Sequence, residues 1–207
     1  DGFAGGEEED LYLKPDLDTF AILPWRPQNG KVARFLCDIC REDGTEYDIS
    51  PRRILKNAVE KAAAKGYTFQ VNPECEFFLF HTDDNGMPTT LSHEKGGYLD
   101  TSPIDLGENT RRDIILTLEE MGYEITSSHH EIASAQHEID FTFEDALATA
   151  DKVMTLKVAV RTIAKRYGLH ATFMPKPKKE QNGSGMHLKM ILQKDGRNIF
   201  ADENGCL

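Results

Sequence analysis

The stretch Val71–Phe80 constrains the fold of this chain most, because it combines a strand-like apolar run with two carboxylates. It reads Val-Asn-Pro-Glu-Cys-Glu-Phe-Phe-Leu-Phe. Alternate residues of a strand point to the same face, so Glu74 and Glu76 project together beside residues typical of a core. Two neighbouring carboxylates repel each other unless a cation or a proton neutralises them. A solvated strand face is the alternative explanation, and the flanking Phe-Phe-Leu-Phe disfavours it.

The composition excludes several classes of protein. The 207 residues include 16 Gly, 9 Pro and 4 Cys, which rules out collagen-like and disulfide-dense chains. Lys and Arg number 24 against 35 Asp and Glu, and this net charge of −11 argues against a nucleic-acid partner. No apolar run approaches the ~20 residues that span a membrane. The first residues lack the pattern of a signal peptide, so we expect a cytoplasmic protein with reduced cysteines.

Turn formers and apolar periodicity predict an α+β chain. A β-hairpin is predicted from strands at 16–25 and 32–39, with a turn at 28–31. Helices are predicted over 50–66, 110–121 and 145–167, and further strands over 67–80, 171–174 and 186–193 and within 132–143. In the longest helix, the residues predicted to lie near one face are Leu147, Ala150, Met154, Val158, Arg161, Ile163 and Ala164.

Two further segments are rich in groups that bind metals or ligands. His129–Glu131 precedes Gln136–Asp140, in which Glu138 and Asp140 share one strand face. This density of carboxylates and imidazoles suits a divalent cation, and a polar strand edge is an equal explanation. In Asn182–His187 two glycines let the backbone approach a ligand closely, and an ordinary flexible loop is the alternative.

Two patterns that suggest binding chemistry are discounted. Cys37 and Cys40 form a C-x-x-C, but no second pair follows at zinc spacing. On the predicted strand these two positions also face opposite sides. The lysines at 176, 178 and 179 could hold phosphate, but a solvated loop explains them equally well.

The chain resembles bacterial type I glutamine synthetase through an ordered set of motifs. Between Asp10 and His187 they read DLYLKPDLDTF, GKVARFLCDI, NPECEFFLF, KGGYLDTSPIDLGENTRRDI, LEEMGYEITSSHHE, QHEIDF, RTIAKRYGLHATFMPKP and NGSGMH. The resemblance implies the end of a β-grasp domain at 1–48. At 49–207 it implies the first half of a catalytic domain, an antiparallel sheet with flanking helices. It also implies ATP-dependent ligation of ammonia to glutamate through γ-glutamyl phosphate, in a homo-oligomer that is a dodecamer in the family.

The resemblance also implies two divalent metals, Mg²⁺ or Mn²⁺, and contacts to the substrate glutamate. The positions that match ligands of the first metal are Glu76, Glu131 and Glu138. Those that match ligands of the second metal are Glu74 and His187. Asn182 and Gly183 match the contacts to glutamate. We expect the three first-metal carboxyl carbons to lie within about 8 Å of one another. Without metal, repulsion should raise the pKa of at least one of these glutamates.

Several positions depart from the family pattern on the nucleotide side. Lys189 stands where the family has His or Asn, Ile191 where it has Ser, and Thr126 where it has Glu, so the metal ligands match while ATP binding is in question. The chain starts without Met, and the family's remaining catalytic groups fall outside these 207 residues. We therefore expect a fragment that is incomplete for catalysis, and we assign no catalytic residue within it.

Two alternatives to an active glutamine synthetase stay open. One is a non-catalytic homologue that still binds divalent metal or joins an assembly, and the other is a related ligase that joins glutamate to a different amine. A piece of this fold should leave sheet edges unpaired and expose the apolar side of Val71–Phe80. We therefore expect either an oligomer or a marginally stable monomer.

Overall fold

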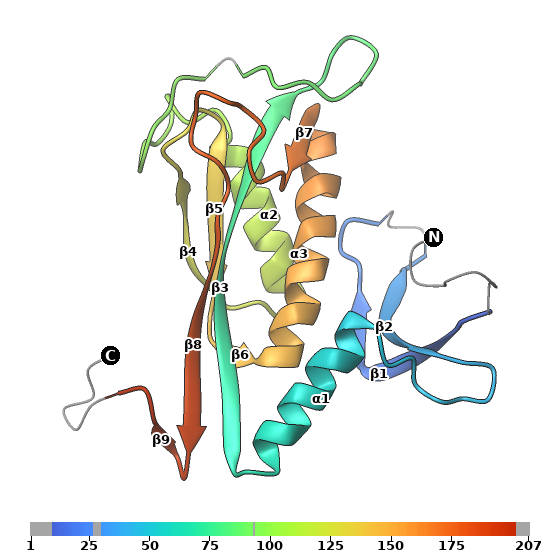
Figure 1. The fold of residues 1–207 in the computed structure, drawn as a ribbon. Helices are drawn as coiled ribbons and strands as arrows, with labels where there is room; N and C mark the ends of the chain where they lie inside the picture. Colours follow the sequence, from blue (N-terminus) through green and yellow to red (C-terminus); the bar gives the residue numbers. More distant parts are fainter. Residues whose placement is uncertain (1–9, 27–29, 93, 202–207) are drawn as a thin grey trace. The chain divides into compact units, whose positions relative to one another are not determined.

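The computed structural model describes residues 10–26, 30–92 and 94–201 (Figure 1). They fall into two compact units. One draws on the segments Asp1–Gln70, Asp145–Asp151 and Met190–Leu207, and the other on Val71–Glu144 and Lys152–Lys189. Among the described residues, no helix combines the length and the apolar character needed to cross a membrane.

The first unit contains the predicted hairpin. Strand β1 (Tyr12–Ile22) pairs antiparallel with β2 (Ala33–Cys40). Strand β1 begins four residues earlier than the alternation predicts and ends before Pro24; the predicted turn at 28–31 lies partly outside the described residues. Cys37 and Cys40 both lie on β2, and neither forms a disulfide bond.

Helix α1 (Pro51–Ala63) follows Ser50 and carries Pro at its start, as predicted. Its second residue, Arg52, binds three carboxylates of the same unit. The guanidinium nitrogens lie 2.7 Å from Asp16, 2.6 Å from Asp38 and 2.9 Å from Asp151. Hydrogen bonding to Arg52 lowers the pKa of Asp16, in spite of the opposing effect of its burial.

Replacing Arg52 by Met should lower the stability of the chain by about 1–2 kcal/mol at pH 7, and by less at pH 3–4. Because the folded-state pKa of Asp16 is depressed, the ion pair stabilises the fold above the unfolded pKa and is lost as the pH falls through the folded one. Thermal unfolding of both proteins between pH 3 and 7 measures this gap. Arg112→Met removes an exposed arginine and serves as the control; a gap that stays constant with pH would contradict the assignment.

The larger sheet has the strand order β4-β5-β3-β8-β9, and β6 and β7 also pair with β3. The bounds are β3 Tyr67–His81, β4 Ile125–His130, β5 Gln136–Phe141, β6 Glu144–Asp145, β7 Leu169–Thr172, β8 Met186–Lys194 and β9 Arg197–Asn198. Strand β3 runs antiparallel to β5 and β7, which confirms the predicted α+β class. Strand β4 was not predicted, because Ile-Thr-Ser-Ser-His-His lacks apolar alternation and becomes a strand through its ladder with β5.

Helices α2 (Glu108–Glu120) and α3 (Ala146–Arg166) lie on one side of this sheet (Figure 1). The predicted face of α3 is buried only in part. Ile163 and Ala164 are buried, but Met154 and Val158 are 59% and 51% exposed, and Leu156 and Val160, which lie outside the predicted set, are fully buried. The helix carries apolar residues on more than one side, and packing selects between them.

The prediction that Val71–Phe80 exposes apolar surface is also wrong. Its apolar side chains are all buried, and Phe77 and Phe78 have no exposed area. Ile114 and Leu118 of α2 are completely buried in the same unit. The helices within these 207 residues therefore suffice to cover the apolar side of β3, leaving its carboxylate side for other contacts.

Candidate metal centre

The register of β3 with β5 gathers four carboxylates on one face of the sheet. Glu74 lies opposite Asp140, and Glu76 lies opposite Glu138. The intervening Cys75 points to the other face and is buried. Local alternation puts two carboxylates on each strand, and the antiparallel ladder doubles their number at one place.

Strand β4 adds an imidazole to this face. His129 lies opposite Glu138 in the β4–β5 ladder, and its Nε2 atom is 3.0 Å from Glu131 Oε1 and 3.9 Å from Glu138 Oε1. Ligand atoms of these three residues all lie within 4.8 Å of one another. The sequence marked the segment His129–Glu131 but gave His129 no role, because the neighbouring strand was not recognised.

The cluster carries more negative charge than its surroundings stabilise. Burial raises the pKa of Glu138, and repulsion from Glu131 and Glu76 raises it further, against the opposing effect of His129. Burial and the Glu138 carboxylate raise the pKa of Asp140 to about 7. The expectation of a raised glutamate pKa is therefore confirmed. A proton or a divalent cation would relieve this repulsion.

Hydrogen bonds connect the loop before β8 to the carboxylate face. Glu76 Oε2 accepts from Gln136 Nε2 at 2.6 Å and from the Gly185 backbone N–H at 2.9 Å. Gln136 Nε2 also donates to the Gly183 carbonyl at 2.9 Å. A Cβ on Gly183 would lie 2.2 Å from the Pro175 carbonyl oxygen, so only glycine fits there. Gln136 thus holds together a carboxylate and the loop that the sequence marked.

A cleft of about 470 Å³ brings the predicted binding residues together. Its lining includes all seven of them: Glu74, Glu76, Glu131, Glu138, Asn182, Gly183 and His187. Tyr98, His129, Ile132 and Gln136 complete it. Among the described residues, the predicted nucleotide positions Lys189 and Ile191 are not part of this lining. Thr126 is exposed at an irregularity of the β4–β5 ladder.

Glu74 differs from the other carboxylates of the face because a cation, the Lys189 ammonium, already contacts it. His187 Nδ1 lies 3.1 Å from one oxygen, and the Lys189 ammonium contacts the other. Hydrogen bonding to Lys189 lowers the pKa of Glu74, in spite of its partial burial. The negative charge of Glu74 is therefore compensated within the chain, whereas that of Glu138 is not.

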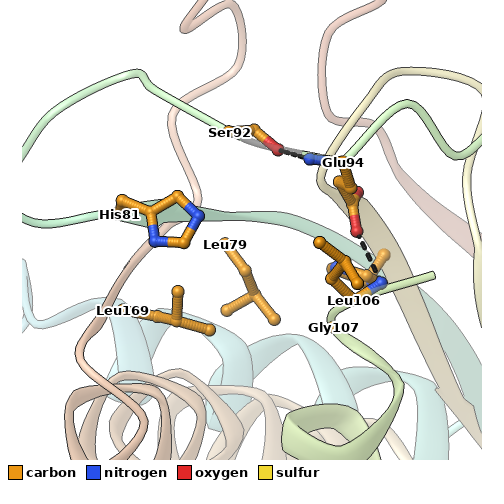
Figure 2. Close-up of a pocket in the computed structure, with 8 residues that line it drawn as sticks. Leu79, His81, Ser92, Glu94, Leu106, Gly107 and Leu169 are labelled. Atoms are coloured by element: carbon orange, nitrogen blue, oxygen red, sulfur yellow. Dashed lines mark hydrogen bonds between the residues drawn. The ribbon is translucent and has the colours of Figure 1, made fainter. Parts of the chain in front are cut away.

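A second group of ionisable residues lies on the opposite, buried face. Glu94 Oε1 accepts from His130 Nε2 at 2.7 Å and from the Ala135 backbone N–H, and Oε2 accepts from the Leu106 N–H at 3.0 Å. Figure 2 shows the Glu94 side chain reaching the backbone at Leu106, beside a cavity of about 50 Å³. No motif in the sequence indicated this network.

The same face contains the buried ion pair of Arg111 and Asp105, at 2.7 Å, and Arg111 also donates to His137 Nδ1 at 2.8 Å. His130 contacts acceptors through both ring nitrogens, which requires an imidazolium. Two carboxylates, one guanidinium and one imidazolium balance in charge. Although ligand atoms of Glu94, Asp105, His130 and His137 lie within 4.8 Å of one another, this balance makes the group a structural network rather than a metal site.

Replacing Gly185 by Ala should weaken divalent-cation binding about 10- to 100-fold while changing stability by less than about 1 kcal/mol. The added Cβ would lie 2.9 Å from Glu76 Oε1, so the carboxylate, a flexible side-chain end, must move. Isothermal titration with Mn²⁺ measures the affinity. Gly97→Ala is the matched control, because its Cβ would meet its nearest neighbour at 3.8 Å. Equal affinities for the two variants would contradict a ligand role for Glu76.

Family models match both parts of the chain. Residues 1–42 match the glutamine synthetase β-grasp domain, and residues 48–207 match the glutamine synthetase catalytic domain. Two curated relatives are glutamine synthetases from Clostridium saccharobutylicum, 59% identical over 204 residues, and Staphylococcus aureus, 51% identical over 205 residues. Each alignment covers 99% of this chain and 46% of the relative. The chain thus spans about half the length of the curated relatives it matches.

Solved structures agree with this match. A structure titled apo GmaS superposes with a TM-score of 0.86 at 28% identity, covering all of this chain and 49% of the other. Plasmodium falciparum glutamine synthetase gives 0.81 at 28% identity, covering 93% of this chain and 43% of the other. The family models cover most of the chain, and two relatives are more than 50% identical to it in sequence. The chain therefore belongs to the glutamine synthetase family.

Proposed function

We propose that the chain is part of a glutamate–ammonia ligase that uses ATP to make glutamine through γ-glutamyl phosphate. The observation that carries this proposal is the convergence of Glu76, Glu131 and Glu138 on one cleft that also includes Asn182 and Gly183. Family membership supplies the reaction class. In this proposal residues 1–48 belong to the β-grasp domain and 49–207 to the catalytic domain.

The donor set fits a divalent cation such as Mg²⁺ or Mn²⁺. Glu76, Glu131 and Glu138 would hold it, because such cations prefer carboxylate oxygens, and His129 offers a nitrogen nearby. The raised pKa of Glu138 supports this, because burial and repulsion from Glu131 and Glu76 cause it and a bound cation would offset both. Such a cation, when bound, would offset negative charge on glutamate and on the acyl phosphate.

The remaining residues would bind and orient the substrates. Asn182 is exposed at the cleft, where its side-chain amide can both donate to and accept from glutamate. Gln136 fixes the Gly183 carbonyl and so orients the backbone beside it. Glu74 and His187 form the proposed second cation position, and Lys189 and Ile191 of β8 mark the proposed nucleotide side.

The proposed assembly is a homo-oligomer working in the cytoplasm. Three apolar side chains on β1 support subunit contacts: Leu13 is 69% exposed, Leu17 72% and Phe20 54%. Apolar residues at this exposure are typical of protein–protein contacts. Light scattering at several concentrations tests this, and a monomer at every concentration would contradict it.

The test of the function is turnover by the 207-residue chain with ATP, glutamate and ammonium in the presence of Mg²⁺ or Mn²⁺. Phosphate release that requires both glutamate and ammonium supports the ligase. Binding of Mn²⁺ without turnover is the result expected of a metal-binding chain that spans about half the length of its relatives, and it leaves the ligase and the non-catalytic homologue to be separated by turnover of a longer protein. Turnover with methylamine but not ammonium supports a ligase for a different amine. Loss of metal binding in Glu138→Ala links any of these activities to the cleft.

A further inference from the structure

Two residues of β8 approach the same carboxylate on β3. His187 and Lys189 are two positions apart on the strand and therefore face the same side. His187 Nδ1 lies 3.1 Å from Glu74 Oε2, and the Lys189 ammonium contacts Glu74 Oε1. Both oxygens of Glu74 are therefore engaged by groups of the chain itself.

A divalent metal bound between Glu74 and His187 would lie beside the Lys189 ammonium, which contacts the other oxygen of the same carboxylate. The lysine ammonium has three N–H donors and no lone pair, so it cannot be a metal ligand. Charges of +1 and +2 about 4 Å apart repel appreciably even in water. This repulsion disfavours a divalent cation at the predicted second metal set, Glu74 with His187, while Lys189 holds its observed position.

We propose that the Lys189 ammonium acts as a built-in cation at Glu74 and takes the place of a second divalent metal, so that the chain binds one divalent cation in the cleft. This inference rests on the proposed function, because it concerns the second cation position of the same site. The Lys189 side chain is 60% exposed, so its other N–H donors are free to bind an anionic oxygen of a ligand.

The cation count of the cleft tests this proposal. Isothermal titration of the 207-residue chain with Mn²⁺ should give one site per chain. Lys189→Asn should add a second site that binds at least about tenfold more tightly than any second binding event of the parent chain. Lys189→Arg retains the positive charge and should keep the count at one. Lys65→Asn removes the same charge from an exposed position elsewhere and should also leave one site.

Each outcome separates this inference from the proposed function. Two sites in the parent chain would overturn the inference and leave the function standing. A parent chain that binds no Mn²⁺ would overturn the function itself. The inference would also be overturned if both Lys189→Asn and Lys189→Gln still bound one Mn²⁺ per chain. Circular dichroism of each variant confirms that it is folded, as expected for a substitution at an exposed side chain.

Discussion

Saturating Mn²⁺ should raise the melting temperature of the chain by roughly 8–16 °C, and the double variant Glu76→Ala, Glu138→Ala should lose this shift. A ligand that binds only the folded state at 1,000 times its Kd adds about 4 kcal/mol. For a chain of this size each kcal/mol corresponds to roughly 2–4 °C. Without metal, the double variant loses the repulsion at Glu138 but also the two hydrogen bonds that Glu76 accepts from Gln136 and Gly185, so the comparison rests on the shift that Mn²⁺ produces in each protein.

The loss of the Mn²⁺-induced shift is the specific signature of the site. The control removes the same charge from α2, by Glu119→Ala with Glu120→Ala, two exposed positions. It should retain the full shift with Mn²⁺. If the cleft variant keeps its shift as well, the cation binds elsewhere in the chain and the ligand assignment is wrong.

Replacing Glu94 by Ala should lower the free energy of unfolding by about 3–5 kcal/mol. Glu94 is buried and accepts from the imidazolium of His130 and from two backbone N–H groups, at Ala135 and Leu106. Its removal leaves a buried cation and two buried donors without their acceptor. Urea unfolding monitored by circular dichroism measures the loss.

Glu108→Ala provides the matched control for this variant. Glu108 also accepts from a backbone N–H, that of Ser102 at 2.8 Å, but in an exposed position. Its loss should cost no more than about 1 kcal/mol, because water can replace the carboxylate. Similar losses for the two variants would mean that Glu94 contributes no more than an ordinary surface hydrogen bond.

Local patterns in the sequence determined much of this protein. The β1–β2 hairpin, the three helices and the long strand β3 follow from turn formers, helix-start residues and periodicity, which act within a few residues of one another. The shared face of Glu74 and Glu76 follows from the same local alternation. The family motifs added His187 and the loop at Asn182 as binding residues, and both line the cleft.

The contacts that make the site were decided by the tertiary structure. The hydrogen bond from Gln136 to Glu76 spans 60 residues, and that from His130 to Glu94 spans 36. Such pairs depend on how strands align with one another, and a shift by one residue would reverse every side chain on a strand. Local patterns carry no information about that alignment. For the same reason, strand β4, the buried face of α3 and the contact of Lys189 with Glu74 could be read only from the folded chain.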